Sequence, residues 1–296
     1  MTIDKLIKGY GGIGKPDDKK KSVSVLSIIT ETFKEWAHFV EHYPYPQYDV
    51  PMPRKYLTAL KNEATRLLVP YDNDLPTIIA DESYFAPIKL LLKTDYHRFA
   101  GLYYTALLDM QERTLIIPEG ITNRDYWKYN YWGYELKKGT VINRNPDEFV
   151  GECARGGVVI NEEKSTCLGY KATGGLFVNY DSVLTYTQYA RGGIFINHKT
   201  VGAFLYWKGK PLLLNYGNAK TLFLFHRKDV KEKKPQEPFL MYGRILLPEG
   251  KIKQDNSLNA LWTELSHHSL QRDWSAVKGL AVRIKRHCTM HYKQNI

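Results

Sequence analysis

A repeating pattern of short apolar runs dominates the middle of the chain. Each run holds three β-branched, aromatic or leucine residues and ends in an asparagine, and successive asparagines are 18 residues apart. Such runs predict short strands, and asparagine suits the turn that follows. The closing asparagines are Asn143, Asn161, Asn179, Asn197 and Asn215. Three of the runs follow a glycine pair, which predicts a bend; the pairs are Gly156 and Gly157, Gly174 and Gly175, and Gly192 and Gly193.

The repeat predicts a β-solenoid between about Lys138 and about Phe225, built of five 18-residue coils. One such unit is too short to bury its own apolar face, so the units must stack, with equivalent strands about 4.8 Å apart. Val183–Tyr189 and Ala203–Trp207 predict a second strand in the other half of the coil. Stacking aligns the asparagines into a column whose amides bond to one another. A column of small residues at a tight corner is predicted at Ala154, Ala172 and Ala190.

Helical periodicity appears on both sides of the repeat. Apolar residues between Ile29 and Val40 predict one helix, and a second is predicted from Pro53 to Pro70. The stretch from Ser83 to Met110 is apolar and interrupted by proline and glycine, and we expect it to be mostly helical. Beyond the repeat, Leu258–Leu265 and Trp274–Ile284 predict two further helices. Because open solenoid ends invite strand pairing, both flanks are candidate caps.

These elements predict an α+β fold, in which a single-stranded β-solenoid lies between an α-helical N-terminal region and a C-terminal helical cap. The expected division is a flexible basic arm (1–22), a mainly helical region (23–112), the solenoid (113–228), a linker with a short strand (229–256) and the cap (257–296).

The segments Phe149–Asn161 and Leu168–Asn179 resemble a glycine-repeat β-helix. That repeat occurs at the C-terminus of the glutamate synthase large subunit and in one of the subunits of formylmethanofuran dehydrogenase. The resemblance covers residues 138–225 only, and the chain departs from the pattern by ending each strand in asparagine and by having Lys210-Pro211 in place of a glycine pair. The resemblance implies a scaffold within a larger enzyme, without catalytic residues of its own, so it transfers no site residues.

Composition indicates a soluble globular protein with a basic surface. Hydrophobic residues make up 43% of the 296, and 42 Lys and Arg against 31 Asp and Glu give a formal charge of +11. This charge favours acidic partners such as nucleic acid or an anionic membrane surface, and of these we expect no membrane partner. Cys153, Cys167 and Cys288 form no recognisable disulfide framework, which predicts a reducing, cytoplasmic location. Neither a signal peptide nor a membrane span is predicted.

Aromatic and basic residues recur along the repeat and form the candidate binding surface. Three arginines, Arg155, Arg191 and Arg227, share one column on alternate rungs, about 9.6 Å apart. The aromatic candidates are Tyr170, Tyr189, Tyr206 and Trp207 in successive coils, with Trp127, Tyr129 and Trp132 at the entrance to the solenoid. Aromatic faces beside cations stack bases and hold phosphates. The ordinary alternative is that these rings stabilise strands and the arginines are plain surface.

Other motifs give weaker signals. Gly9–Lys15 matches the spacing of a phosphate-binding loop, but Pro16 replaces its hydroxyl residue, so we expect a charged arm. The histidines around Cys288 and at His267-His268 fit no standard zinc spacing, and we interpret them as polar helix surface. Neither a Gly-x-Ser-x-Gly nor a His-Glu-x-x-His motif occurs. No cofactor or metal is predicted.

The hypothesis from sequence is a non-catalytic intracellular binding scaffold for an acidic macromolecule, RNA or a ribonucleoprotein, or for a protein partner. Two alternatives stay open. One is an accessory subunit of a multisubunit enzyme, and the other is an enzyme with a site between the helices and the solenoid.

Overall fold

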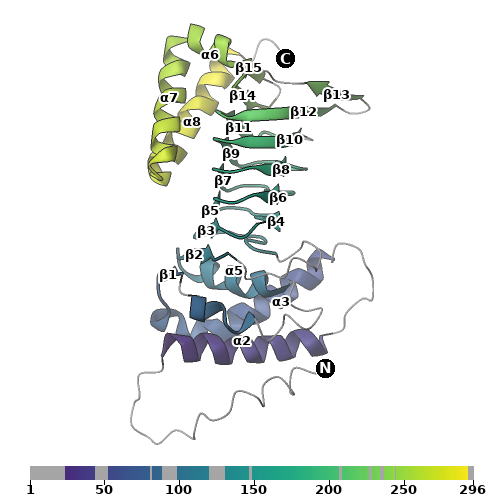
Figure 1. Ribbon diagram of the computed structural model, residues 1–296, viewed down its shortest axis with the longest axis vertical. Coiled ribbons are helices and arrows are strands. Elements are labelled where there is room, and N and C mark those ends of the chain that lie inside the picture. The colour runs from purple at the N-terminus through teal and green to yellow at the C-terminus, as the bar shows by residue number, and fades with distance from the viewer. Residues whose placement is uncertain are drawn as a thin grey trace, which may run out of the picture.

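The computed structural model describes residues 24–43, 53–80, 82–88, 99–119, 131–146, 149–206, 209–226, 229–233, 237–243 and 245–292. N-terminal helices lie at one end of a stack of strands, and the C-terminal helices lie beside the other end (Figure 1). This arrangement is the α+β fold that the periodicity predicts.

The stack consists of two sheets that face each other across the solenoid core. Sheet A has the order β1-β2-β3-β5-β7-β9-β11-β14-β15, and sheet B has the order β13-β12-β10-β8-β6-β4. The strands of sheet A are β1 Ile78–Ile79, β2 Thr114–Ile117, β3 Thr140–Asn143, β5 Val158–Asn161, β7 Leu176–Asn179, β9 Ile194–Asn197, β11 Leu212–Asn215, β14 Phe239–Tyr242 and β15 Ile245–Pro248. The strands of sheet B are β4 Phe149–Val150, β6 Ser165–Leu168, β8 Val183–Tyr186, β10 Thr200–Tyr206, β12 Asn218–His226 and β13 Asp229–Lys233.

The strand register confirms the 18-residue repeat. Parallel pairing aligns Asn143 with Asn161, and each later strand-ending asparagine with the next. The five strands that end in these asparagines enclose four complete turns. The five predicted coils therefore correspond to a solenoid of about four turns. Sheet A also extends before the repeat, because β2 pairs in parallel with β3 and places Ile117 opposite Asn143.

Both faces of sheet A are buried. Val159, Phe177 and Phe195 point into the solenoid and belong to the core that continues into the N-terminal helices. Their neighbours Ile160 and Val178 belong to a second core that includes the C-terminal helices. Strands buried on both faces are apolar at consecutive positions, which explains why the runs show no alternation with polar residues.

The glycine pairs turn the chain where successive coils touch. A Cβ at Gly174 would lie 2.2 Å from the carbonyl oxygen of Arg155 in the preceding coil. The next residue, Gly175, has φ +93°, in the left-handed region that glycine adopts without steric cost. Each pair therefore serves two needs, close approach at its first residue and left-handed backbone at its second.

The N-terminal end is covered by helices at the predicted positions. They are α2 Val25–His42, α3 Arg54–Leu68 and α5 Ala100–Met110, joined by the short 3-10 segments η1 Val69–Asp74 and η2 Glu82–Phe85. The side chain of Ser24 caps α2 by accepting a bond from the Ser27 N–H at 3.1 Å. Of the stretch expected to be mostly helical, η2 and α5 are helical, and residues 89–98 lie outside the described ranges.

The C-terminal helices are confirmed, and their position differs from a cap over the open end. The expected linker (229–256) contains three strands, β13, β14 and β15. The helices that follow them are α6 Glu249–Gln254, α7 Asn256–Leu270 and α8 Trp274–His291. β14 pairs antiparallel with β11 and so terminates the parallel part of sheet A. α7 and α8 lie along the outer face of sheet A (Figure 1), where Leu265 and Ile284 share a core with Val178. The apolar outer face of the sheet, rather than its edge, binds these helices.

Candidate functional site

The asparagine column is a structural ladder. Each Nδ2 donates to the Oδ1 of the next asparagine, at 3.0, 2.8, 2.8 and 2.7 Å along the stack. Asn197 Nδ2 also donates to the carbonyl of Lys199 at 2.9 Å, and its neighbours in the column make the equivalent bond. Because these buried amides are occupied with one another, the column fixes coil register and leaves no group for a ligand.

A basic ridge runs along one corner of the solenoid. We define the basic corner as six exposed cations: Lys137, Lys138, Arg155, Lys171, Arg191 and Lys210. Backbone bonds between coils hold them in rows, including Arg191 N to the Ala172 carbonyl at 2.8 Å and Lys210 N to the Arg191 carbonyl at 3.1 Å. Rigid stacking thus fixes the spacing of these charges.

Arg155 and Arg191, two of the three predicted arginines, share a column, and the first is partly neutralised. Thr173 stands between Arg155 and Arg191, so the two arginines are two coils apart. Arg155 pairs with the buried carboxylate of Glu135 at 3.1 Å, and Arg54 from α3 pairs with the same carboxylate at 2.5 Å. These two arginines hold the pKa of Glu135 below its ordinary value against the opposing effect of burial. Arg227 lies outside the described residues.

Two of the predicted tyrosines meet at the same corner. The rings of Tyr170 and Tyr189 are 5.7 Å apart with their planes at 75°. Lys171 Nζ lies 4.7 Å from the centre of the Tyr170 ring, and Tyr189 is 37% exposed. The structure therefore brings aromatic faces and cations together on adjacent coils.

One residue in each coil at this corner has a left-handed backbone conformation. Glu135, Cys153, Lys171 and Tyr189 occupy equivalent positions in successive coils, with φ of 48°, 56°, 54° and 57°. Left-handed backbone costs on the order of 1 kcal/mol or more at a residue with a side chain, so it persists only where the surroundings enforce it. Stacking of the coils imposes the same conformation at each level.

Among the other predicted aromatics, the structure describes the side chain of Trp132 alone. Trp132 is fully buried and packs 5.8 Å from Tyr104 in the N-terminal core, so it is a core residue and offers no exposed face. The backbone of Tyr206 belongs to β10, and its side chain is outside the described set, as are residues Trp127, Tyr129 and Trp207.

A buried carboxyl group lies behind the basic corner. Glu152 is 8% exposed, and within the described structure its Oε2 atom has no hydrogen-bond partner. Burial raises the pKa of Glu152 to about 7, and the charge of Lys171 opposes that shift. Burial, with a further contribution from Glu152, also raises the pKa of the adjacent Cys153 thiol to about 11. A thiol that stays protonated is a poor nucleophile, so this cluster does not indicate cysteine catalysis.

One column that sequence reasoning missed fastens α7 to sheet A. The residues after the last three strand-ending asparagines form it, and Tyr180, His198 and Tyr216 stack at 5.4 and 5.3 Å. Burial lowers the pKa of His198 to about 4, and its Nε2 contacts the hydroxyl of Ser269 in α7. Ser269 is fully buried, so this histidine and serine form a packing contact. The 18-residue spacing of the three rings was the available signal.

Two of the C-terminal histidines contact aspartates that cap helices. His287 Nε2 lies 2.7 Å from Asp255 Oδ2, which also accepts a bond from the Tyr292 hydroxyl at 2.9 Å. His268 lies 3.2 Å from Asp273. Asp255 and Asp273 are the N-terminal caps of α7 and α8, so His287 connects α8 to the start of α7, and His268 connects α7 to the start of α8.

Comparison with protein-family models, curated proteins and solved structures gives no match for this chain. The β-helix architecture implied by the resemblance is confirmed by the strand register, whereas the glycine-repeat family itself stays a prediction. Among the helices of the described residues, none is long and apolar enough to span a membrane.

Proposed function

We propose that the protein is a non-catalytic binding scaffold that holds an acidic macromolecule, RNA or a ribonucleoprotein, at its basic corner. The observation that carries this proposal is the alignment of six exposed cations with the Tyr170 and Tyr189 pair. Two of the carboxylates beside them are already paired, Asp109 with Lys61 at 2.7 Å and Glu135 with Arg54. A net positive charge therefore faces solvent.

The physical basis is phosphate binding combined with base stacking. Neutralising phosphates releases counterions, and six contacts to a single strand give a slope of roughly −4 in log K against log salt concentration. Stacking on a tyrosine contributes on the order of 1–3 kcal/mol per base and tolerates any sequence. The asparagine ladder supports both by holding the coils in one register, so little ordering is needed on binding.

The test compares two triple variants of equal charge. Lys171→Gln, Arg191→Gln and Lys210→Gln remove three cations from the corner, and Lys251→Gln, Lys278→Gln and Arg283→Gln remove three exposed cations from α6 and α8. Binding of a mixed-sequence single-stranded RNA is followed by fluorescence anisotropy over a salt series. The corner variant is expected to lose about 2 from the slope, and the control to keep it.

Two results would contradict this proposal. Negligible affinity of the parent protein at low salt would exclude a nucleic-acid partner. Equal losses in both variants would show a diffuse effect of net charge, with no role for the corner. A Tyr189→Leu variant separates stacking from charge, because it is expected to weaken binding at every salt concentration with the slope unchanged.

The alternative proposal is an accessory subunit of a larger enzyme, which the glycine-pair corners and their resemblance to a β-helix scaffold support. Affinity purification from native cells, with and without nuclease, distinguishes the two. A stoichiometric, nuclease-resistant partner of known activity favours the subunit, and nuclease-sensitive recovery of RNA-bound proteins favours the scaffold. In either case we propose a cytoplasmic location, consistent with three free cysteines in the described structure.

A further inference from the structure

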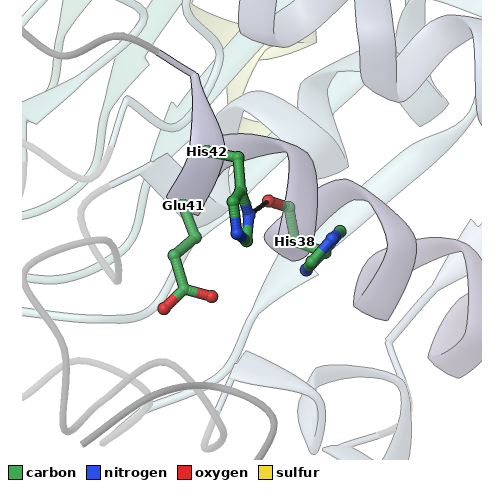
Figure 2. Close-up of side chains that lie close together, drawn as sticks. All are labelled: His38, Glu41 and His42. Carbon is green, nitrogen blue, oxygen red and sulfur yellow. Dashed lines mark hydrogen bonds between the residues drawn. The ribbon is translucent and has the colours of Figure 1, made fainter.

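The C-terminal end of α2 carries three metal-ligating side chains on one face. His38, Glu41 and His42 are spaced i, i+3 and i+4, which brings them together on a helix. Their ligand atoms all lie within 4.8 Å of one another, and the two imidazole rings are 4.2 Å apart (Figure 2). The two histidines are exposed and Glu41 is half-buried, so an ion has access from solvent.

The orientation of His42 suits a ligand. Its Nδ1 lies 2.8 Å from the backbone carbonyl of His38 (Figure 2). A carbonyl only accepts hydrogen bonds, so Nδ1 carries a proton, and in the neutral imidazole Nε2 then keeps its lone pair. Metal-binding histidines commonly use such a second bond to fix the ring and its tautomer.

The position in the helix adds a favourable field. The site occupies the last five residues of α2, which ends at His42. The carbonyl groups at a helix C-terminus carry a partial negative charge of about half an electron, which favours a cation. Glu41 adds a full negative charge, so the site offsets much of the charge of a divalent ion.

We propose that His38, Glu41 and His42 bind a divalent transition-metal ion, with Zn²⁺ as the best match to the ligands. Two imidazoles and a carboxylate suit zinc and its neighbours in the first row, whereas Ca²⁺ and Mg²⁺ prefer oxygen ligands alone. With bonds of about 2.0–2.2 Å, tetrahedral ligands lie roughly 3.4 Å apart, so these side chains close slightly around the ion. Three protein ligands leave a position for water or a further group.

The sequence contains a signal for this site. His38-x-x-Glu41-His42 is the reverse order of the His-Glu-x-x-His motif, and a helical His-x-x-Glu-His pattern is itself a known metal-binding arrangement. In such motifs the two histidines bind the metal and the glutamate acts as a base, so the assignment of Glu41 as a third ligand rests on its distance from the two imidazoles. The forward motif alone does not reveal it. The site lies on α2, apart from the basic corner, and the proposal is independent of the proposed function.

The experiment titrates Zn²⁺, and Co²⁺ as a spectroscopic substitute, into the full chain purified without a polyhistidine tag. Isothermal calorimetry gives affinity, and Co²⁺ absorption reports nitrogen ligation. The variants are His38→Gln, Glu41→Gln and His42→Gln. The matched control is His291→Gln, because His287 and His291 form a second i, i+4 pair with rings 4.4 Å apart. Circular dichroism verifies that each variant folds.

We expect His38→Gln and His42→Gln each to weaken Zn²⁺ binding at least tenfold, Glu41→Gln to weaken it less, and His291→Gln to leave it unchanged. Excess Mg²⁺ is expected not to compete. Absence of saturable binding by the parent, or binding lost in His291→Gln and retained in His38→Gln, would overturn the proposal. Binding that persists in all four variants would do the same.

Discussion

Asn161 donates its Nδ2 proton to Asn179 Oδ1 at 2.8 Å, and both side chains are fully buried. The two residues are 18 positions apart in sequence and meet because their coils stack. Asn179 in turn donates to Asn197 at 2.8 Å. Removing the Asn179 side chain therefore breaks two ladder bonds and its bond to the Asp181 carbonyl.

We expect Asn179→Ala to destabilise the protein by about 2–4 kcal/mol. The change removes three hydrogen bonds of the Asn179 side chain, which accepts from Asn161 and donates to Asn197 and to the Asp181 carbonyl, and each contributes about 0.5–1.5 kcal/mol. Urea unfolding followed by far-UV circular dichroism measures the loss. Asn218→Ala is the control, since Asn218 is exposed and its loss is expected to stay within about 0.5 kcal/mol. Equal effects at the two positions would argue against a structural role for the ladder.

Replacing glycine by alanine is expected to change stability in opposite directions at a coil corner and in helix α8. Gly174→Ala places a Cβ 2.2 Å from the Arg155 carbonyl oxygen, so the coils must separate, and we expect a loss of at least about 2 kcal/mol. Gly279→Ala in α8 meets nothing within 4 Å. There the better helix propensity of alanine is expected to add about 0.5–1 kcal/mol. Thermal unfolding of both variants is the measurement, and destabilisation by Gly279→Ala would contradict the packing described for α8.

Glu152 predicts a pH dependence of stability. Its pKa is raised from 4.5 to about 7 in the folded state, so the folded protein holds the proton more tightly than the unfolded chain. Below pH 4.5 both states are protonated and no penalty applies. Between pH 4.5 and pH 7 the unfolded chain releases this proton while the folded protein retains it, so the free energy of unfolding falls by up to about 3 kcal/mol and then levels off above pH 7.

The variant Glu152→Gln removes this ionisation. We expect it to gain stability relative to the parent between pH 5 and pH 8, as measured by urea unfolding at both values. A constant difference between the two proteins would show that Glu152 does not titrate in this interval. Glu163→Gln, at an exposed position, is the control and is expected to show little change.

The local elements were predictable because their signals are local. The 18-residue spacing of Asn143 to Asn215 determines the coil length, and the register follows once the coils stack. Likewise, the apolar periodicity of 29–40 and the proline at position 53 locate α2 and α3. The candidate binding surface was partly predictable for the same reason, since Arg155 and Arg191 are 36 residues, or two coils, apart.

The sequence by itself thus determined the repeat, its buried asparagines and most of the helices, because periodicity fixes which side chains share a face. The tertiary structure alone decided which surfaces meet. An apolar stripe on α7 does not specify its partner, and the fold places it on the outer face of sheet A, with Ser269 against His198. The burial of Trp132 and the ion pair between Glu135 and Arg54, which are 81 residues apart, also depend on tertiary structure, because both result from packing between distant segments.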